Sequence, residues 1–263
     1  MTWLRGLAKC RLLALAVVAF VIGLLEFLPA HLFEDRINRA LPPPWHLTVS
    51  GTIWDGLGVL RAGQAFDALI VPLTWKFNPR ALARLRLGWK IVPASPALSG
   101  SVNIGAGWQS LEFRDAALIM DAATLQQAVP VIAIFAPSGN IFVSTPQDAG
   151  LTMDYGNDLR LNGDAHIKAD NFGLRPFSPQ PLGNYQLTFT ARDTTIAYVI
   201  TQSSGALKLD GGGSIQTASP RQIAYSGTLT PSPALPDNIL SQLKAMGHPA
   251  GDGRLRVDWQ GRW

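Results

Sequence analysis

The chain has 263 residues, 47% of them hydrophobic and 15% charged, with a formal net charge of +4 at pH 7. The 22 lysines and arginines are scattered, so the sequence has no basic cluster typical of nucleic-acid binding. A single cysteine, Cys10, excludes an intramolecular disulfide, so an extracytoplasmic domain would depend on packing alone.

The N-terminus predicts a membrane anchor. Arg5, Lys9 and Arg11 precede the uncharged run Leu12–Leu25, and acidic residues follow that run. Positive charge before a span places the N-terminus in the cytoplasm. We therefore expect four segments, with the bulk of the chain in the periplasm and one pass through a bacterial inner membrane. These are a cytoplasmic tail (1–11), a transmembrane helix (12–30), a proline-rich connector (31–46) and a periplasmic β domain (47–263).

A cleaved signal peptide is the alternative interpretation of the same run, because its apolar core of 14 residues also suits a signal sequence. Cleavage needs small residues at the −3 and −1 positions, and the local candidate, Leu28-Pro29-Ala30, has a leucine at the first of them. A lipoprotein is disfavoured because Cys10 precedes the apolar run, whereas a lipidated cysteine follows it.

The β domain is predicted to begin with an alternating strand from Leu47 to Ile53, followed by a tight turn at Asp55-Gly56. A second alternating run covers 69–77. Asn78-Pro79 then has the pattern of an N-cap with proline at the first helical position, and predicts a short helix through Arg84. Alternation resumes over 85–91.

The remainder predicts short strands separated by glycine-rich turns. A helix is expected at 122–129 and another at 237–246, the latter ended by Gly247. The apolar run 131–135 is a candidate buried strand. The other strands are expected at 101–104, 111–113, 141–144, 151–155, 159–169, 185–192, 195–201, 205–209, 223–230 and 254–260. This pattern predicts a mainly β protein: one curved antiparallel β-sheet, or a sandwich-like arrangement, with two or three short helices behind a single transmembrane helix.

Several segments resemble protein N of the bacterial type II secretion system. GTIWDG (51–56) is followed by LTWKFNPRALARLRLGWKI (73–91), and later stretches at 161–189, 205–216, 239–247 and 251–261 are also similar to that family. The resemblance implies an inner-membrane accessory component that takes part in export of folded proteins across the outer membrane. Its implied partners are other components of the system, either the inner-membrane platform or the secretin.

The sequence offers no catalytic, cofactor-binding or metal-binding set, and we do not expect an enzyme. The four histidines, at positions 31, 46, 166 and 248, share no ligand spacing. Asp154 and Asp158 lack the glycine and acidic positions of a calcium loop. Ser241 and Lys244 match S-x-x-K without its partner motifs.

Two contact hypotheses remain. Trp54 lies out of phase with the apolar side chains of its strand, so it covers the turn, the opposite face of the sheet or a partner. Trp54, Asp55 and Gly56 are therefore the predicted partner-binding residues. The alternative is a lipid-binding module, in which apolar residues on the concave face of a curved sheet near a bilayer hold acyl chains.

Overall fold

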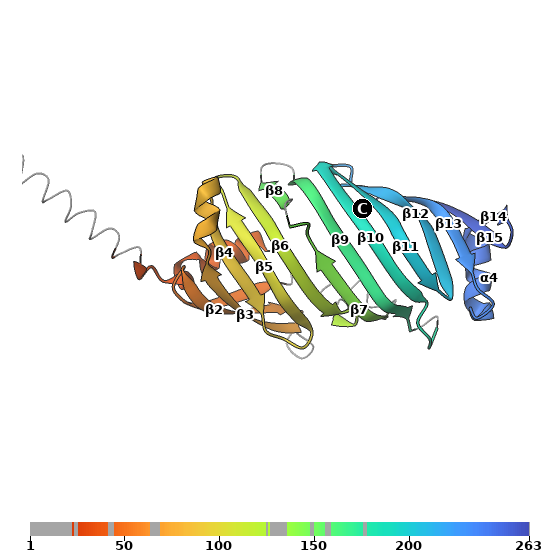
Figure 1. The fold of residues 1–263 in the computed structure, drawn as a ribbon, viewed down its shortest axis with the longest axis horizontal. Coiled ribbons are helices and arrows are strands. Elements are labelled where there is room, and N and C mark those ends of the chain that lie inside the picture. The colour runs from red at the N-terminus through yellow and green to blue at the C-terminus, as the bar shows by residue number, and fades with distance from the viewer. Residues whose placement is uncertain are drawn as a thin grey trace, which may run out of the picture.

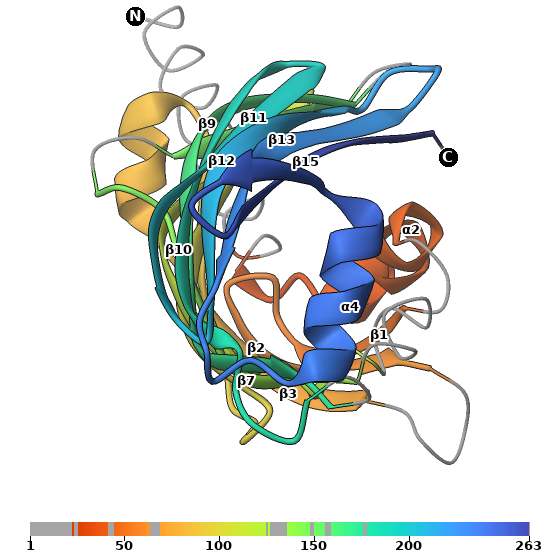
Figure 2. The same ribbon diagram turned by 90° about the vertical axis from the view of Figure 1, so that its right-hand side faces the viewer.

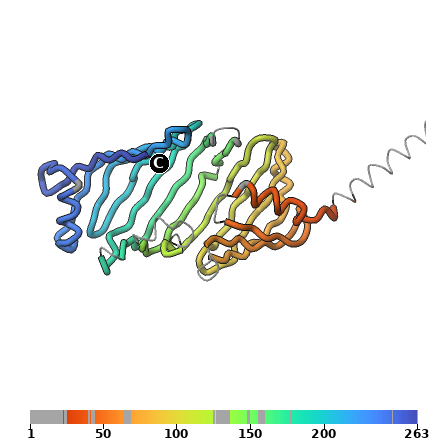
Figure 3. Tube along the Cα trace, turned by 180° about the vertical axis from the view of Figure 1, so that it is seen from behind, coloured from red at the N-terminus to blue at the C-terminus, as the bar shows by residue number. Residues whose placement is uncertain are grey.

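In the computed structural model, one 15-stranded sheet is the body of the protein (Figure 1). The structure describes residues 23, 26–41, 45–63, 69–124, 126, 136–147, 150–155, 159–175 and 178–262. Neighbouring strands pair antiparallel and mostly follow chain order, as the trace seen from behind also shows (Figure 3). The strands are β1 (His46–Gly51), β2 (Asp55–Ala62), β3 (Leu69–Phe77), β4 (Leu87–Pro93), β5 (Leu98–Ala106), β6 (Ser110–Asp121), β7 (Pro137–Ser144), β8 (Leu151–Tyr155), β9 (Leu159–Leu174), β10 (Gly183–Asp193), β11 (Thr195–Gly205), β12 (Leu207–Gln216), β13 (Gln222–Pro231), β14 (His248–Gly251) and β15 (Arg254–Arg262).

Short helices lie near the ends of this sheet. The 3-10 helix η1 (Ala30–Phe33) and helix α2 (Glu34–Ala40) precede β1, and the 3-10 helix η2 (Pro79–Arg84) joins β3 to β4. Helix α4 (Asp237–Met246) joins β13 to β14. Viewed along the sheet, the strands form a curve with α2 and α4 on its open side (Figure 2). We call the side of the sheet that α4 packs against the inner face and the other side the outer face.

The strand register assigns side chains to these two faces, because paired residues share a face and successive residues alternate. The row Leu118, Val143, Ile167, Leu187 and Ile200 crosses five neighbouring strands on the inner face. Other apolar residues on this face include Leu47, Val49, Leu60, Val71, Leu73, Trp75, Phe77, Trp89, Ile91, Val102, Ile104, Phe113, Met120, Ile141, Leu151, Met153, Tyr185, Phe189, Tyr198, Leu209, Ile215, Tyr225, Leu229, Leu255 and Val257.

Irregularities in the strands bend the sheet. An extra residue in β6, Asp115, has φ 48° where the register with β5 shifts, and Asn171 has φ 51° where β9 and β7 change register. Such bulges increase the twist and bend the strand that carries them. Gly100 has φ 119°, and a Cβ there would overlap the backbone of Ala117. A residue without a side chain is therefore required at that close approach.

Two groups of buried apolar residues lie at opposite ends of the sheet. At the C-terminal end, Ile239 of α4 packs on Leu229 and Leu255, in a cluster that also buries four further residues, Leu182, Leu207, Leu235 and Val257. Near the N-terminal end, Ala62, Leu69 and Val71 form a smaller cluster. Burial of this kind is the main favourable contribution to folding.

Most of the predicted strands are confirmed, and so is one continuous sheet rather than two layers. The turn predicted at Asp55-Gly56 is wrong: these residues begin β2, a strand that the pattern did not predict, and the turn lies at 52–54. The pattern also missed β14. Asn78 is confirmed as the N-cap of η2, where its side chain accepts a hydrogen bond from the Arg80 N–H.

Some predictions fall on other residues. The predicted strand 131–135 and half of the predicted helix 122–129 lie outside the described residues, as do 12–22, 24 and 25 of the predicted anchor. Within the described ranges, no helix combines the length and apolar character that a membrane span requires. The transmembrane helix and the four-segment division therefore stay predictions.

Candidate functional surfaces

The turn between β1 and β2 is built by the residues of the GTIWDG stretch. Gly51 has φ 94°, and the Thr52 hydroxyl accepts hydrogen bonds from the N–H groups of Trp54 (3.3 Å) and Asp55 (3.2 Å). Serine and threonine hydroxyls commonly stabilise turns in this way. The first part of the stretch therefore fixes the conformation of the chain.

Two tryptophans of the neighbouring strands hold this turn in place. The indole N–H of Trp75 donates to the Thr52 carbonyl (3.1 Å), and that of Trp89 donates to the Ile53 carbonyl (2.6 Å). A Cβ on Gly56 would overlap the Trp75 ring, so glycine at this position gives the indole its space. Two of the sequence segments that carry the family resemblance, 51–56 and 73–91, thus form one structural unit.

The predicted partner-binding residues differ in accessibility. Asp55 is exposed, whereas Gly56 is buried and Trp54 is half-buried. The Trp54 ring lies edge-on to Phe77, with centroids 4.7 Å apart, and the Trp54 carbonyl accepts a hydrogen bond from the Phe77 N–H. These contacts give Trp54 and Gly56 a role in packing, and partner binding at the three residues stays a prediction.

A group of exposed apolar side chains lies at one rim of the sheet, where η2 and the β5–β6 turn are neighbours. Leu85 is 94% exposed and Trp108 is 95% exposed, with Leu82 and Leu87 about half exposed. The pairing of Leu87 with Ala106 brings the start of β4 beside the β5–β6 turn. We call these four residues the rim patch. Clustered exposed apolar side chains are typical of binding surfaces.

Positive charge lies beside the rim patch. The carboxylate of Glu112, on the outer face, is buried among three arginines: its distances to the Nε atoms are 2.6 Å for Arg114, 3.5 Å for Arg84 and 3.6 Å for Arg86. Arg86 also donates to the Ser110 hydroxyl, which anchors it under the β5–β6 turn. Three guanidinium groups thus share the Glu112 carboxylate beside Leu85 and Trp108, and Asp154 lies opposite Ser110 on the same face.

The inner face of the middle strands, β4 to β11, differs from both ends of the sheet. The five side chains of the row from Leu118 to Ile200 are neither buried nor fully exposed, whereas the small side chains of Ala116, Ala169 and Ala191 on the same face are buried. Tyrosines stand at its C-terminal boundary. The Tyr185 hydroxyl donates to the Leu207 carbonyl (2.8 Å), and burial raises the Tyr185 pKa to about 12. Burial also raises the pKa of Tyr225, whose buried hydroxyl has no hydrogen-bond partner among the described residues.

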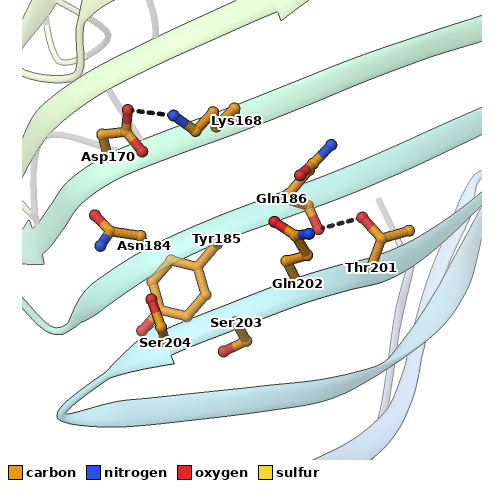
Figure 4. Close-up of a pocket in the computed structure, with 9 residues that line it drawn as sticks. All are labelled: Lys168, Asp170, Asn184, Tyr185, Gln186, Thr201, Gln202, Ser203 and Ser204. Carbon is orange, nitrogen blue, oxygen red and sulfur yellow. Dashed lines mark hydrogen bonds and ion pairs between the residues drawn. The ribbon is translucent and has the colours of Figure 1, made fainter.

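A shallow pocket of about 490 Å³ lies over β9, β10 and β11 (Figure 4). Lys168 and Asp170 pair within it at 2.8 Å, and the Thr201 hydroxyl donates to the Gln186 carbonyl. The Lys168 ammonium also lies 5.5 Å from the centre of the Phe142 ring. Lys168 and Asp170 are the charged residues of the pocket lining, and the other side chains that line it are neutral. No group of three or more metal-ligating side chains occurs in the part of the chain that the structure describes.

Comparison with known proteins gives a consistent result. A profile of the family described as type II secretion system (T2SS), protein N, matches residues 45–258. The chain is 31% identical over 271 residues to the type II secretion system protein N of Aeromonas hydrophila, and the alignment covers 97% of this chain and 98% of that protein. No solved structure matches the chain.

Proposed function

Because the chain belongs to the type II secretion system protein N family, we propose that it is an inner-membrane accessory component of that system and takes part in the export of folded proteins across the outer membrane. The match over nearly the whole length of the chain carries this proposal. Its role in the assembly is to bind other components through its surface, and catalysis is no part of it.

The rim patch is the contact surface that we favour. Leu85 and Trp108 are almost fully exposed, and arginines stand next to them. Exposed aromatic and aliphatic side chains beside arginine are the residue types that dominate binding energy at protein interfaces. The proposed partner is therefore another component of the system, either the inner-membrane platform or the secretin, with an apolar and acidic surface.

The proposed location is the inner membrane, with the sheet in the periplasm. The charge pattern around residues 12–25 supports it. The residues that follow that segment contact the sheet: the Ile53 N–H donates to the Leu28 carbonyl (3.0 Å), and Pro29 bridges to Thr52. An anchor at this position would hold the β1 end of the sheet nearest the bilayer.

The test is crosslinking in native membranes followed by co-purification, together with export assays in a strain that lacks the protein. We expect wild-type protein to recover other secretion components and to restore export. The double variant Leu85→Asn, Trp108→Ser should lose both, whereas Leu57→Ser, an exposed leucine on β2, should keep both. Recovery of no secretion component, with normal export in the deletion strain, would contradict the proposal.

A further inference from the structure

The inner face lacks charge along the whole sheet. Among the described strand residues, the register places every Asp, Glu, Lys, Arg and His on the outer face except Asp193, the last residue of β10. Asp193 lies at the rim, where its carboxylate pairs with Arg160 at 3.4 Å. An ordinary antiparallel sheet buries such an apolar face against a second layer.

The two ends of the inner face are closed, but its middle strands are only half-buried. The row from Leu118 to Ile200 lies between the two buried clusters and does not reach their degree of burial. Partly exposed apolar side chains in an unbroken row over five strands leave some apolar surface accessible in the folded protein. Extended apolar surface on a folded protein usually marks a binding site.

The chemistry of this face selects a hydrocarbon occupant. The side chains of the row Leu118, Val143, Ile167, Leu187 and Ile200 contain no hydrogen-bond donor or acceptor. An extended peptide on the face of a sheet, unlike one added at an edge, would leave its amide groups without partners at considerable cost. A hydrocarbon chain has no polar groups to satisfy, and it gains free energy in proportion to the apolar area that it buries.

The position and length of the face identify the source of that hydrocarbon. The β1 end is tied to Leu28, directly after the uncharged segment 12–25. From β4 to β11 the sheet has six strand-to-strand steps, so this part of the face extends about 29 Å at ~4.8 Å per step. That is close to the ~30 Å hydrocarbon thickness of a bilayer, which two leaflets of acyl chains fill, so an acyl chain fits along it.

We propose that the inner face of β4 to β11 binds the acyl chains of glycerophospholipids taken from the membrane that anchors the protein. The chains lie along the row from Leu118 to Ile200, and the headgroups stay in water on the open side of the curve. The proposal rests on the proposed function only for its membrane anchoring. It does not depend on which secretion component the protein contacts.

Photo-crosslinking in intact cells tests this binding with full-length protein. A photoreactive amino acid is placed at Leu118, on the inner face, or at Ile119, the exposed neighbour on the outer face of the same strand. A second matched pair is Ile200 and Val199 on β11. We expect phospholipid adducts, identified by mass spectrometry of the purified chain, at Leu118 and Ile200 and at least about tenfold less adduct at Ile119 and Val199.

Three results would overturn the proposal: protein adducts in place of lipid at Leu118 and Ile200, equal lipid labelling on both faces, or no lipid adduct at either inner position in a chain that co-purifies normally. Co-purification of secretion components in the same cells reports on the proposed function separately. Lost partners with retained lipid adducts would overturn the proposed function and leave the lipid site standing.

Discussion

The α4 end of the sheet and its middle strands share one sequence pattern and differ in burial. Leu229 and Leu255 lie under α4 with 7% and 6% of their surface exposed. Leu118 and Val143 occupy equivalent inner-face positions but are only half-buried. One alternating apolar face thus reaches two degrees of burial in this protein: at the end it stabilises the fold, and in the middle it is the face that we propose holds acyl chains.

The largest effect separates these two regions directly. Leu255→Ala removes side-chain volume from a packed cluster, and we expect a loss of about 2–5 kcal/mol in the free energy of unfolding, as for other buried leucines. Leu118→Ala should cost about 1 kcal/mol, because its side chain is already partly in contact with solvent. Urea denaturation of the two variants measures both. Equal losses would show that the middle strands are packed core.

The next effect concerns the close approach of β5 and β6 at Gly100. Gly100→Ala combines a positive φ with backbone overlap at Ala117, and we expect it to cost more than about 2 kcal/mol. The matched control is Gly251→Ala, which has a similarly positive φ but no atom within 4 Å of its Cβ position, and should cost about 1 kcal/mol. Thermal denaturation of the two variants measures both losses. An equal loss of stability in Gly251→Ala would show that the positive φ alone, and not the close approach of the strands, makes glycine necessary at position 100.

A smaller effect is expected at the turn near the β1 end. Trp89→Phe removes the indole donor to the Ile53 carbonyl while keeping an aromatic ring on the inner face, and should cost about 1 kcal/mol. Hydrogen exchange should show faster opening of residues 52–56 and little change in the cluster under α4. Protection that falls equally in both regions would indicate that the turn and the C-terminal cluster open together.

The smallest effect at neutral pH is Tyr185→Phe, at the boundary of the α4 cluster. Burial raises the pKa of this hydroxyl from 10.0 to about 12, so the folded state favours the neutral form. Its contribution to stability is complete below pH 10 and is lost as the pH rises through about 12. The variant should lose about 1 kcal/mol at pH 7 with the hydrogen bond to Leu207, and its stability should fall less steeply between pH 10 and 12. If the free energy of unfolding of the variant falls as steeply between pH 10 and 12 as that of wild type, groups other than Tyr185 cause the alkaline loss of stability.

Alternation along the chain predicted which residues share a face of the sheet, because that property is local. The position of the first turn was not predictable from the same pattern. Asp55-Gly56 is a favourable turn dipeptide, yet the chain turns at 52–54 because the Trp75 and Trp89 indoles, from distant strands, hydrogen-bond to that segment. Contacts between remote strands outweighed a local preference.

The rim patch and the half-buried inner face were also beyond the sequence pattern. Leu85 continues the apolar alternation of the following strand, but it ends η2 with φ 57° and its side chain is 94% exposed. Alternation assigned Leu118 and Val143 to a common face without indicating whether a second layer would cover it. That depends on where α4 and the other helices pack.

The central claim, that the middle strands hold acyl chains, is tested most directly by the phospholipid content of full-length protein extracted gently from membranes. We expect wild-type protein and the Ile119→Glu control to retain phospholipid in native mass spectra at similar occupancy. Leu118→Glu, which places a carboxylate in the apolar row, should reduce occupancy at least about tenfold without preventing folding. Equal occupancy in the two glutamate variants, or wild-type protein free of lipid, would contradict the claim.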